Sequence, residues 1–193
     1  SGSSFLERAA QRDAAGDHDE AINELARGTK AGDRASTAAL GLRLLMGDRA
    51  PLLPSEGLRF LDDLCGLGSG EAAARAAGLL ALGVHLPPNR ALALEWLRKS
   101  ADAGWEPAQR QLLALCDDRD LAVRAATSRG IAWKFMAAAI DLASWDRAPA
   151  ANVLSDEPRV STFPGFIRTE ICEFLISLTP GRLEPAKVYD PVN

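Results

Sequence analysis

Histidine, the side chain that most often binds metal ions or acts as a general base, is rare in this sequence. The chain has two histidines, His18 and His85. His18 follows Gly16 and Asp17 in a predicted turn, and His85 lies in a loop bounded by prolines. Isolated histidines in turns and loops are more often surface residues than metal ligands. We therefore expect both to be surface or loop residues.

Cysteine and glycine motifs do not point to catalysis either. Cys65, Cys116 and Cys172 are odd in number, far apart and inside apolar helical patterns, which favours small buried side chains over a disulfide or a metal site. Gly68 and Gly70 resemble part of a nucleotide-binding turn, but no strand precedes them. The sequence therefore predicts no catalytic, cofactor-binding or metal-binding residue.

The spacing of glycines gives the main clue to the fold. Gly32, Gly68 and Gly104 are 36 residues apart, and Gly47 and Gly83 keep the same interval. Helix residues before these glycines form three columns with the same spacing: Ile22, Leu58 and Leu94; Leu25, Leu61 and Leu97; Thr29, Cys65 and Ala101. A period of one helical hairpin is typical of an α-solenoid, in which each hairpin buries its apolar face against the next. The sequence therefore predicts a mainly α fold, an α-solenoid of helical hairpins.

Three hairpins and the start of a fourth can be followed along the chain. They cover residues 5–32, 34–66 and 70–104, and the fourth starts at Glu106. Prolines interrupt the long connections inside the second and third hairpins, because proline cannot continue a helix. The repeat period is lost after residue 116.

Two further helices are predicted beyond the repeats. Residues 118–129 are amphipathic, and residues 131–145 are apolar almost all round. A helix without a polar face must be packed on several sides. We expect residues 131–145 to form one helix that closes the end of the stack, although Trp133 and Trp145 could instead face a second domain.

The helix at residues 91–104, ALALEWLRKSADAG, carries a family resemblance. It resembles the second helix of the Sel-one-like repeat, a relative of the tetratricopeptide repeat. The matching residues are Trp96, Arg98, Lys99, Ala101 and Gly104. The second hairpin has Phe60 in the place of Trp96 and no basic pair, and the first has Glu24 there. The resemblance covers residues 5–116 and implies a scaffold that binds a protein or peptide on its concave surface.

The composition changes near residue 148. We expect a helical-repeat solenoid with capping helices over residues 1–147, a proline-containing linker at 148–157 and a separate segment at 158–193. Within that segment, residues 158–166 predict a strand and a turn, and residues 169–178 a helix. The residues expected to face inward on this helix are Ile171, Phe174, Leu175 and Leu178. Residues 182–191 predict an extended stretch.

This last segment resembles the opening of the catalytic domain in the prolyl 4-hydroxylase class of iron and 2-oxoglutarate-dependent oxygenases. The residues that carry the resemblance are Pro158, Val160, Phe166, Ile167, Glu170, Cys172, Leu175 and Ile176. Arg168 departs from the small capping residue usual there, and a generic strand and helix is the alternative. The resemblance implies that a complete domain would hold Fe(II) by two histidines and a carboxylate, and 2-oxoglutarate by a basic residue. Residues 158–193 stop before that metal motif.

Charge and hydropathy exclude two classes of partner. Lys and Arg total 22 against 26 Asp and Glu, a net charge of −4, which argues against a nucleic-acid partner. The longest apolar run is too short to span a bilayer. No secretory signal is recognised, so we expect a soluble, cytoplasmic protein.

The expected binding surface lies on the first helices of the hairpins. Arg43, Arg75 and Gln111 are candidate exposed residues for contact with a protein or peptide partner. The alternative is that they only solvate this face. Two functions follow: a binding scaffold at the N-terminal side of an oxygenase, or a non-enzymatic repeat adaptor.

Overall fold

The computed structural model describes residues 4–83, 86–127, 132–181 and 183. The chain is mainly helical, as predicted. It divides into two compact units, Ser1–Leu142 and Ala143–Asn193. The division falls a few residues before residue 147, where the sequence predicts the end of the solenoid.

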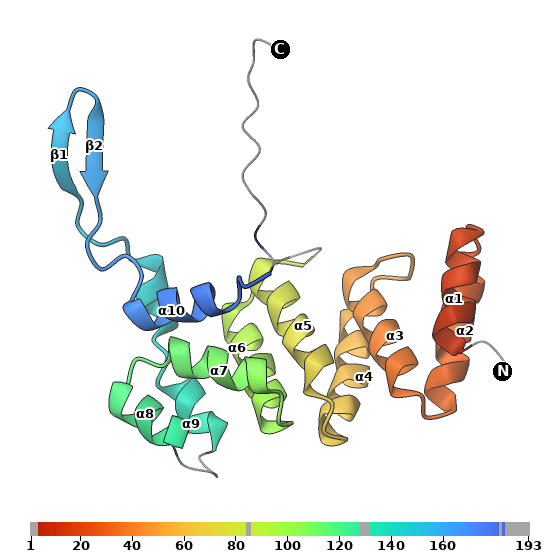
Figure 1. Cartoon of the computed structure of the whole chain (residues 1–193). Helices are drawn as coiled ribbons and strands as arrows, with labels where there is room; N and C mark the ends of the chain where they lie inside the picture. The colour runs from red at the N-terminus through yellow and green to blue at the C-terminus, as the bar shows by residue number, and fades with distance from the viewer. Residues whose placement is uncertain (1–3, 84–85, 128–131, 182, 184–193) are drawn as a thin grey trace. The chain divides into compact units, whose positions relative to one another are not determined.

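The first unit is built from helices that pack against their neighbours in sequence (Figure 1). Its helices are α1 (Phe5–Ala14), α2 (His18–Lys30), α3 (Arg34–Met46), α4 (Pro54–Gly66), α5 (Gly70–Leu82), α6 (Arg90–Asp102), α7 (Glu106–Leu115), α8 (Arg119–Thr127) and α9 (Trp133–Ala138). α1 pairs with α2, α3 with α4, and α5 with α6, and α3 also contacts α1 and α5. The first helices of the three pairs therefore share one face.

Polar side chains fix where several of these helices begin. Ser4 and Glu7 form a reciprocal capping box at α1. The Asp33 carboxylate accepts from two amides in the first turn of α3, and the Asn89 side chain accepts from the Leu92 amide at 2.9 Å. Each cap satisfies amides that have no partner within the helix, so the boundaries are set locally.

The 36-residue period reappears in the backbone. Gly32, Gly68 and Gly104 have φ of 79°, 77° and 84°, a left-handed conformation that glycine adopts without a steric penalty. The residue after each glycine donates its amide to a carbonyl five residues earlier: Asp33 to Gly28, Ser69 to Leu64, and Trp105 to Ser100. The two longer connections are closed by equivalent backbone hydrogen bonds, in which the Leu53 amide donates to the Leu44 carbonyl and the Asn89 amide to the Leu80 carbonyl. The sequence repeat is thus also a repeat of turn geometry.

Small residues let the paired helices approach closely. A Cβ added to Gly57 of α4 would lie 2.5 Å from the carbonyl oxygen of Gly41 on α3. The corresponding positions of the next pair hold buried Ala77 and Ala93. Larger side chains fill the core around these contacts, among them Leu45, Leu61, Leu64, Leu80, Trp96, Leu97 and Leu112.

The end of the first unit differs from the prediction of one helix over residues 131–145. The structure has α9 and a separate 3-10 helix, η1 (Leu142–Asp146). Asp117 accounts for the break, because its amide donates to the Ala139 carbonyl at 2.9 Å and its carboxylate accepts from the Asp141 amide at 2.6 Å. α9 packs against α6 and α7.

The second unit contains a β-hairpin and a helix. β1 (Asn152–Asp156) pairs with β2 (Arg159–Thr162) in antiparallel register, with an irregularity between Val153 and Ser155. α10 (Thr169–Ser177) follows and coincides with the predicted helix. β1 lies inside the segment predicted as a linker at 148–157, so that segment is not uniformly irregular.

Apolar side chains of α10 are more exposed than predicted. Ile171 and Phe174 are half-buried, but Leu175 and Leu178 are 49% and 39% exposed. The prediction that these two leucines face inward is therefore wrong for the described chain. A two-stranded hairpin offers too little surface to cover both sides of a helix. The extended stretch predicted at 182–191 lies outside the described residues except for Leu183.

Candidate ligand-binding hollows on the first helices

Two adjoining hollows lie on the face shared by α1, α3 and α5. The first has a volume of about 510 Å³ and the second of about 480 Å³. Leu6 of α1 and Ala39 of α3 line both. We refer to them as the first hollow, which extends to α5, and the second hollow, which extends to the connection after α3.

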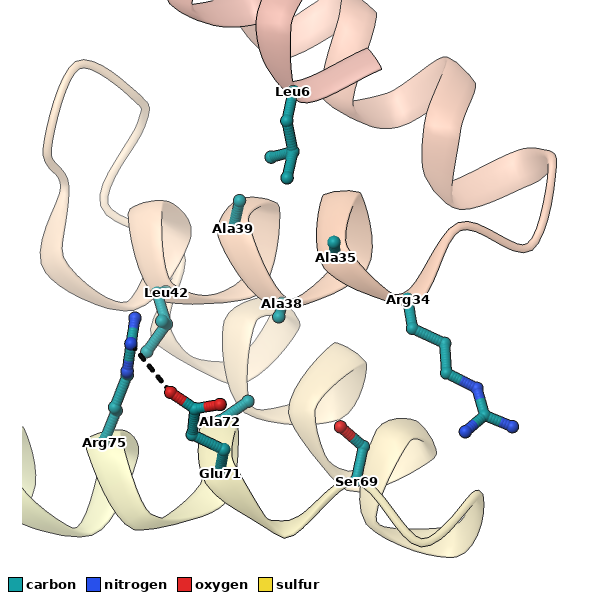
Figure 2. A pocket seen from close by; sticks show the side chains of 10 residues that line it. All are labelled: Leu6, Arg34, Ala35, Ala38, Ala39, Leu42, Ser69, Glu71, Ala72 and Arg75. Atoms are coloured by element: carbon teal, nitrogen blue, oxygen red, sulfur yellow. Dashed lines mark hydrogen bonds and ion pairs between the residues drawn. The ribbon is translucent and has the colours of Figure 1, made fainter. Parts of the chain in front are cut away.

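Short side chains form the floor of the first hollow (Figure 2). Its apolar lining consists of Leu6, Ala35, Ala38, Ala39, Leu42 and Ala72. Leu6 points from α1 towards the alanines of α3. Because alanine ends at Cβ, a ligand could come close to the helix backbones, and its apolar groups would meet an apolar surface.

Charged side chains surround this floor. Glu71 and Arg75, one turn apart on α5, form an ion pair at 2.8 Å (Figure 2). Both are exposed, so their pairing contributes little to stability. Arg34, the first residue of α3, makes no hydrogen bond or ion pair with any residue that the structure describes. Its guanidinium donors are available to a ligand.

A buried ion pair lies beside the second hollow. Arg43 of α3 donates to both oxygens of Asp13 of α1, one of them at 3.2 Å. His18 Nδ1 lies 3.0 Å from the same carboxylate, and the Asp13 side chain is only 6% exposed. The hydrogen bond from Arg43 holds the pKa of Asp13 below its usual value. This group of three residues joins α1 to α3 and the start of α2.

Arg49 also lines the second hollow, from the connection after α3. It is exposed, and its φ of 51° is unusual for a residue with a side chain. Its charge helps to lower the pKa of Asp13, but it forms no hydrogen bond or ion pair within the described part of the chain. Each hollow therefore has one arginine without a bound carboxylate.

The three residues predicted to contact a partner lie in different places. Arg75 lines the first hollow. Arg43 lines the second hollow, where it already forms an ion pair with Asp13. Gln111 is half-buried on α7 and lines neither hollow. Sequence reasoning missed Arg34 and Arg49. Arg34 could have been noticed as a cation at a helix N-terminus, whereas no signal in the sequence marks Arg49.

The described residues do not provide an iron site. They contain no group of three or more His, Cys, Asp or Glu side chains placed to hold a metal ion. The Nδ1 atom of His18 is hydrogen-bonded to the Asp13 carboxylate, and His85 lies outside the described residues. Cys116 is buried, Cys65 and Cys172 are half-buried, and burial raises the pKa of the Cys65 and Cys116 thiols.

No protein-family model, curated protein or solved structure matches this chain. Within the described residues, every helix is too short or too polar to cross a membrane. The two hollows and the residues that line them are therefore the features of this chain that indicate a function.

Proposed function

We propose that the first unit is an α-solenoid of Sel-one-like repeats that binds a protein or peptide segment in the two hollows. The observation that carries this proposal is the pair of adjoining hollows on the face of α1, α3 and α5, with an alanine-rich floor and arginines at its edge. The repeated turn bonds and the 36-residue glycine columns support the solenoid assignment.

An extended segment suits this surface better than a compact small molecule. The hollows share Leu6 and Ala39, and together they run from α5 across α3 and α1 to the connection after α3. Stacked hairpins present such extended surfaces to their partners. A small-molecule site would instead enclose most of its ligand.

Selection from a random twelve-residue peptide library on residues 1–193 tests the proposal. Selected peptides should lose at least tenfold in affinity with Ala35→Trp, because the indole would fill the first hollow from an exposed position on α3. Ala81→Trp is the matched control, since Ala81 is exposed on α5 and lines neither hollow. Equal loss in both variants, or selected peptides that ignore Ala35→Trp, would contradict binding at this place.

We also propose that the second unit belongs to the opening of a prolyl 4-hydroxylase-like domain, so that the scaffold serves an iron and 2-oxoglutarate-dependent oxygenase. The exposed apolar residues of the hairpin and α10 support this, because such a surface needs further polypeptide to cover it. They include Val153, Leu154, Val160, Phe166, Ile167, Leu175 and Ile176.

The coding sequence after Asn193 separates this proposal from the alternative of a non-enzymatic adaptor. A strand-rich stretch with an HxD motif and a later histidine would support an oxygenase. Its absence would leave the adaptor, whose second unit would have to be covered by another partner.

A further inference from the structure

We infer that the segment recognised in the hollows is an acidic, extended peptide, with carboxylates bound by Arg34 and Arg49 and small apolar side chains on the alanine floor. This inference rests on the proposed peptide-binding function and specifies the chemistry of its ligand.

The charge of the lining differs in sign from that of the whole chain. Four arginines and two acidic residues line the hollows, namely Arg34, Arg43, Arg49, Arg75, Asp13 and Glu71. The chain as a whole carries more acidic than basic residues. An acidic segment would be attracted to this face and repelled by much of the remaining surface, which favours one binding place and orientation.

Arg34 and Arg49 both stand where an arginine is locally unfavourable. Arg34 occupies the positive end of the α3 dipole, where no acidic residue is present in the first turn. The neighbouring Asp33 carboxylate does not pair with it, because that group is bonded to the amides of Ala35 and Ser36 and to the Ser36 hydroxyl. Arg49 adopts a left-handed backbone conformation without being glycine.

Neither arginine forms a hydrogen bond or an ion pair within the described chain, although Asp13 is near enough to feel the charge of Arg49. Such local violations are concentrated at functional sites, where a ligand supplies the missing interaction. A carboxylate is the natural partner, because the guanidinium fork matches its two oxygens. Arg43 is already bound to Asp13, and Arg75 to Glu71, so Arg34 and Arg49 are the residues that select the ligand.

Single-stranded nucleic acid is the other extended anion to consider. Proteins that bind it stack its bases on aromatic side chains. The described residues that line the two hollows include no aromatic ring. The alanine floor therefore favours a peptide with small side chains.

Fluorescence anisotropy with residues 1–193 tests this inference at low salt. The probe is an end-blocked, fluorescein-labelled ten-residue peptide that alternates Glu and Ala, which puts its two residue types on opposite sides of an extended chain. The matched probes replace Glu by Gln or by Lys. The Glu peptide should bind at least tenfold more tightly than the Gln peptide, and the Lys peptide should not bind.

The double variant Arg34→Gln/Arg49→Gln should reduce the preference for Glu over Gln to less than twofold. The double variant Arg59→Gln/Arg124→Gln removes the same two charges from exposed positions on α4 and α8, outside both hollows, and should preserve the preference. Circular dichroism checks that each variant is folded.

Four results would overturn the inference. Equal binding of the Glu and Gln peptides, or insensitivity to the double variant, would leave peptide binding intact but remove its acidic specificity. If none of the three peptides bound, the acidic specificity would also be refuted. The library selection described above would then decide separately whether the hollows bind peptides. Tighter binding of a ten-nucleotide single strand that depends on Arg34 and Arg49 would assign the site to nucleic acid.

Discussion

The Ser100 hydroxyl of α6 donates a 2.7 Å hydrogen bond to the carbonyl oxygen of Gly70, the first residue of α5. Both residues are buried. A Cβ on Gly70 would lie 2.6 Å from the Ser100 carbonyl oxygen and 2.7 Å from Trp105 Cβ. The α5–α6 hairpin therefore has no room for a side chain at residue 70, and the glycine is required by close packing.

Gly70→Ala should lower the free energy of unfolding by about 1–3 kcal/mol, the usual effect of overpacking. Gly78→Ala on the same helix is the control, because Gly78 is exposed and has nothing within 4 Å of an added Cβ. It should be neutral or stabilising by up to about 1 kcal/mol, since alanine favours the helix. Urea titration followed by circular dichroism measures both, and equal effects would refute the packing argument.

The turn glycines predict a graded series. Gly68→Ala should cost about 1–2 kcal/mol through the left-handed conformation alone, since an added Cβ meets nothing within 4 Å. Gly83→Ala should cost more, because its Cβ would also lie 2.6 Å from Pro88. Gly68→Asn should be milder than Gly68→Ala. Unfolding midpoints for the three variants test this order, and a smaller effect at Gly83 than at Gly68 would contradict it.

Glu24 predicts a pH-dependent contribution to stability. It is 7% exposed and accepts from Arg8 at 2.8 Å and from Arg27 at 2.6 Å. The hydrogen bond from Arg8, with the nearby charges, lowers its pKa. A lowered pKa means that the ionised carboxylate stabilises the fold above the unfolded-state value of about 4.3, and that this stability is lost as the pH falls through the folded-state value.

Glu24→Gln should therefore destabilise the protein at pH 7, and its difference from the wild type should shrink between pH 5 and pH 3. Unfolding free energies measured at several pH values across this range provide the test. Glu95→Gln, at an exposed position of α6, should follow the wild-type pH profile. A difference for Glu24→Gln that stays constant with pH would show that the carboxylate charge is not involved.

Residues 1–142 should fold without the second unit. Every buried residue of the two hydrophobic clusters lies before residue 143. The shortened chain should keep its helical circular dichroism and unfold within about 0.5 kcal/mol of the full chain, the range of changes away from the core. Limited proteolysis should first cut the full chain near residues 148–157. Loss of helical structure in 1–142, or uniform resistance to the protease, would contradict a separable first unit.

Local features of the fold could be predicted because they depend on neighbouring residues. A left-handed turn favours glycine, so Gly32, Gly68 and Gly104 revealed both the period and the helix ends. The start of α2 is equally local, because the Asp17 carboxylate accepts from the Glu20 amide of the helix that it precedes. Interactions between distant residues could not be predicted in this way.

Two contacts between distant residues and one hollow account for the main differences between the prediction and the structure. Arg43 was expected to be exposed, but Asp13 binds it from thirty positions earlier in the chain. Asp117 breaks the helix predicted over 131–145 by bonding to the backbone near Asp141. Arg34 became a candidate only when the structure revealed the hollow beside it. These residues are visible in the sequence, but which of them lie close together depends on how the hairpins stack.

A hydrogen bond from the Leu53 amide to the Leu44 carbonyl closes the connection between α3 and α4, which carries Arg49. The exposed residues Asp48, Arg49 and Pro51 can therefore change without disturbing the register of α3 against α4, whereas Ala50 packs against the core. Arg49, which faces the second hollow, lies on this replaceable stretch rather than on a helix. Ligand preference could thus evolve, or be engineered, by exchanging a short loop while the helical framework is inherited intact.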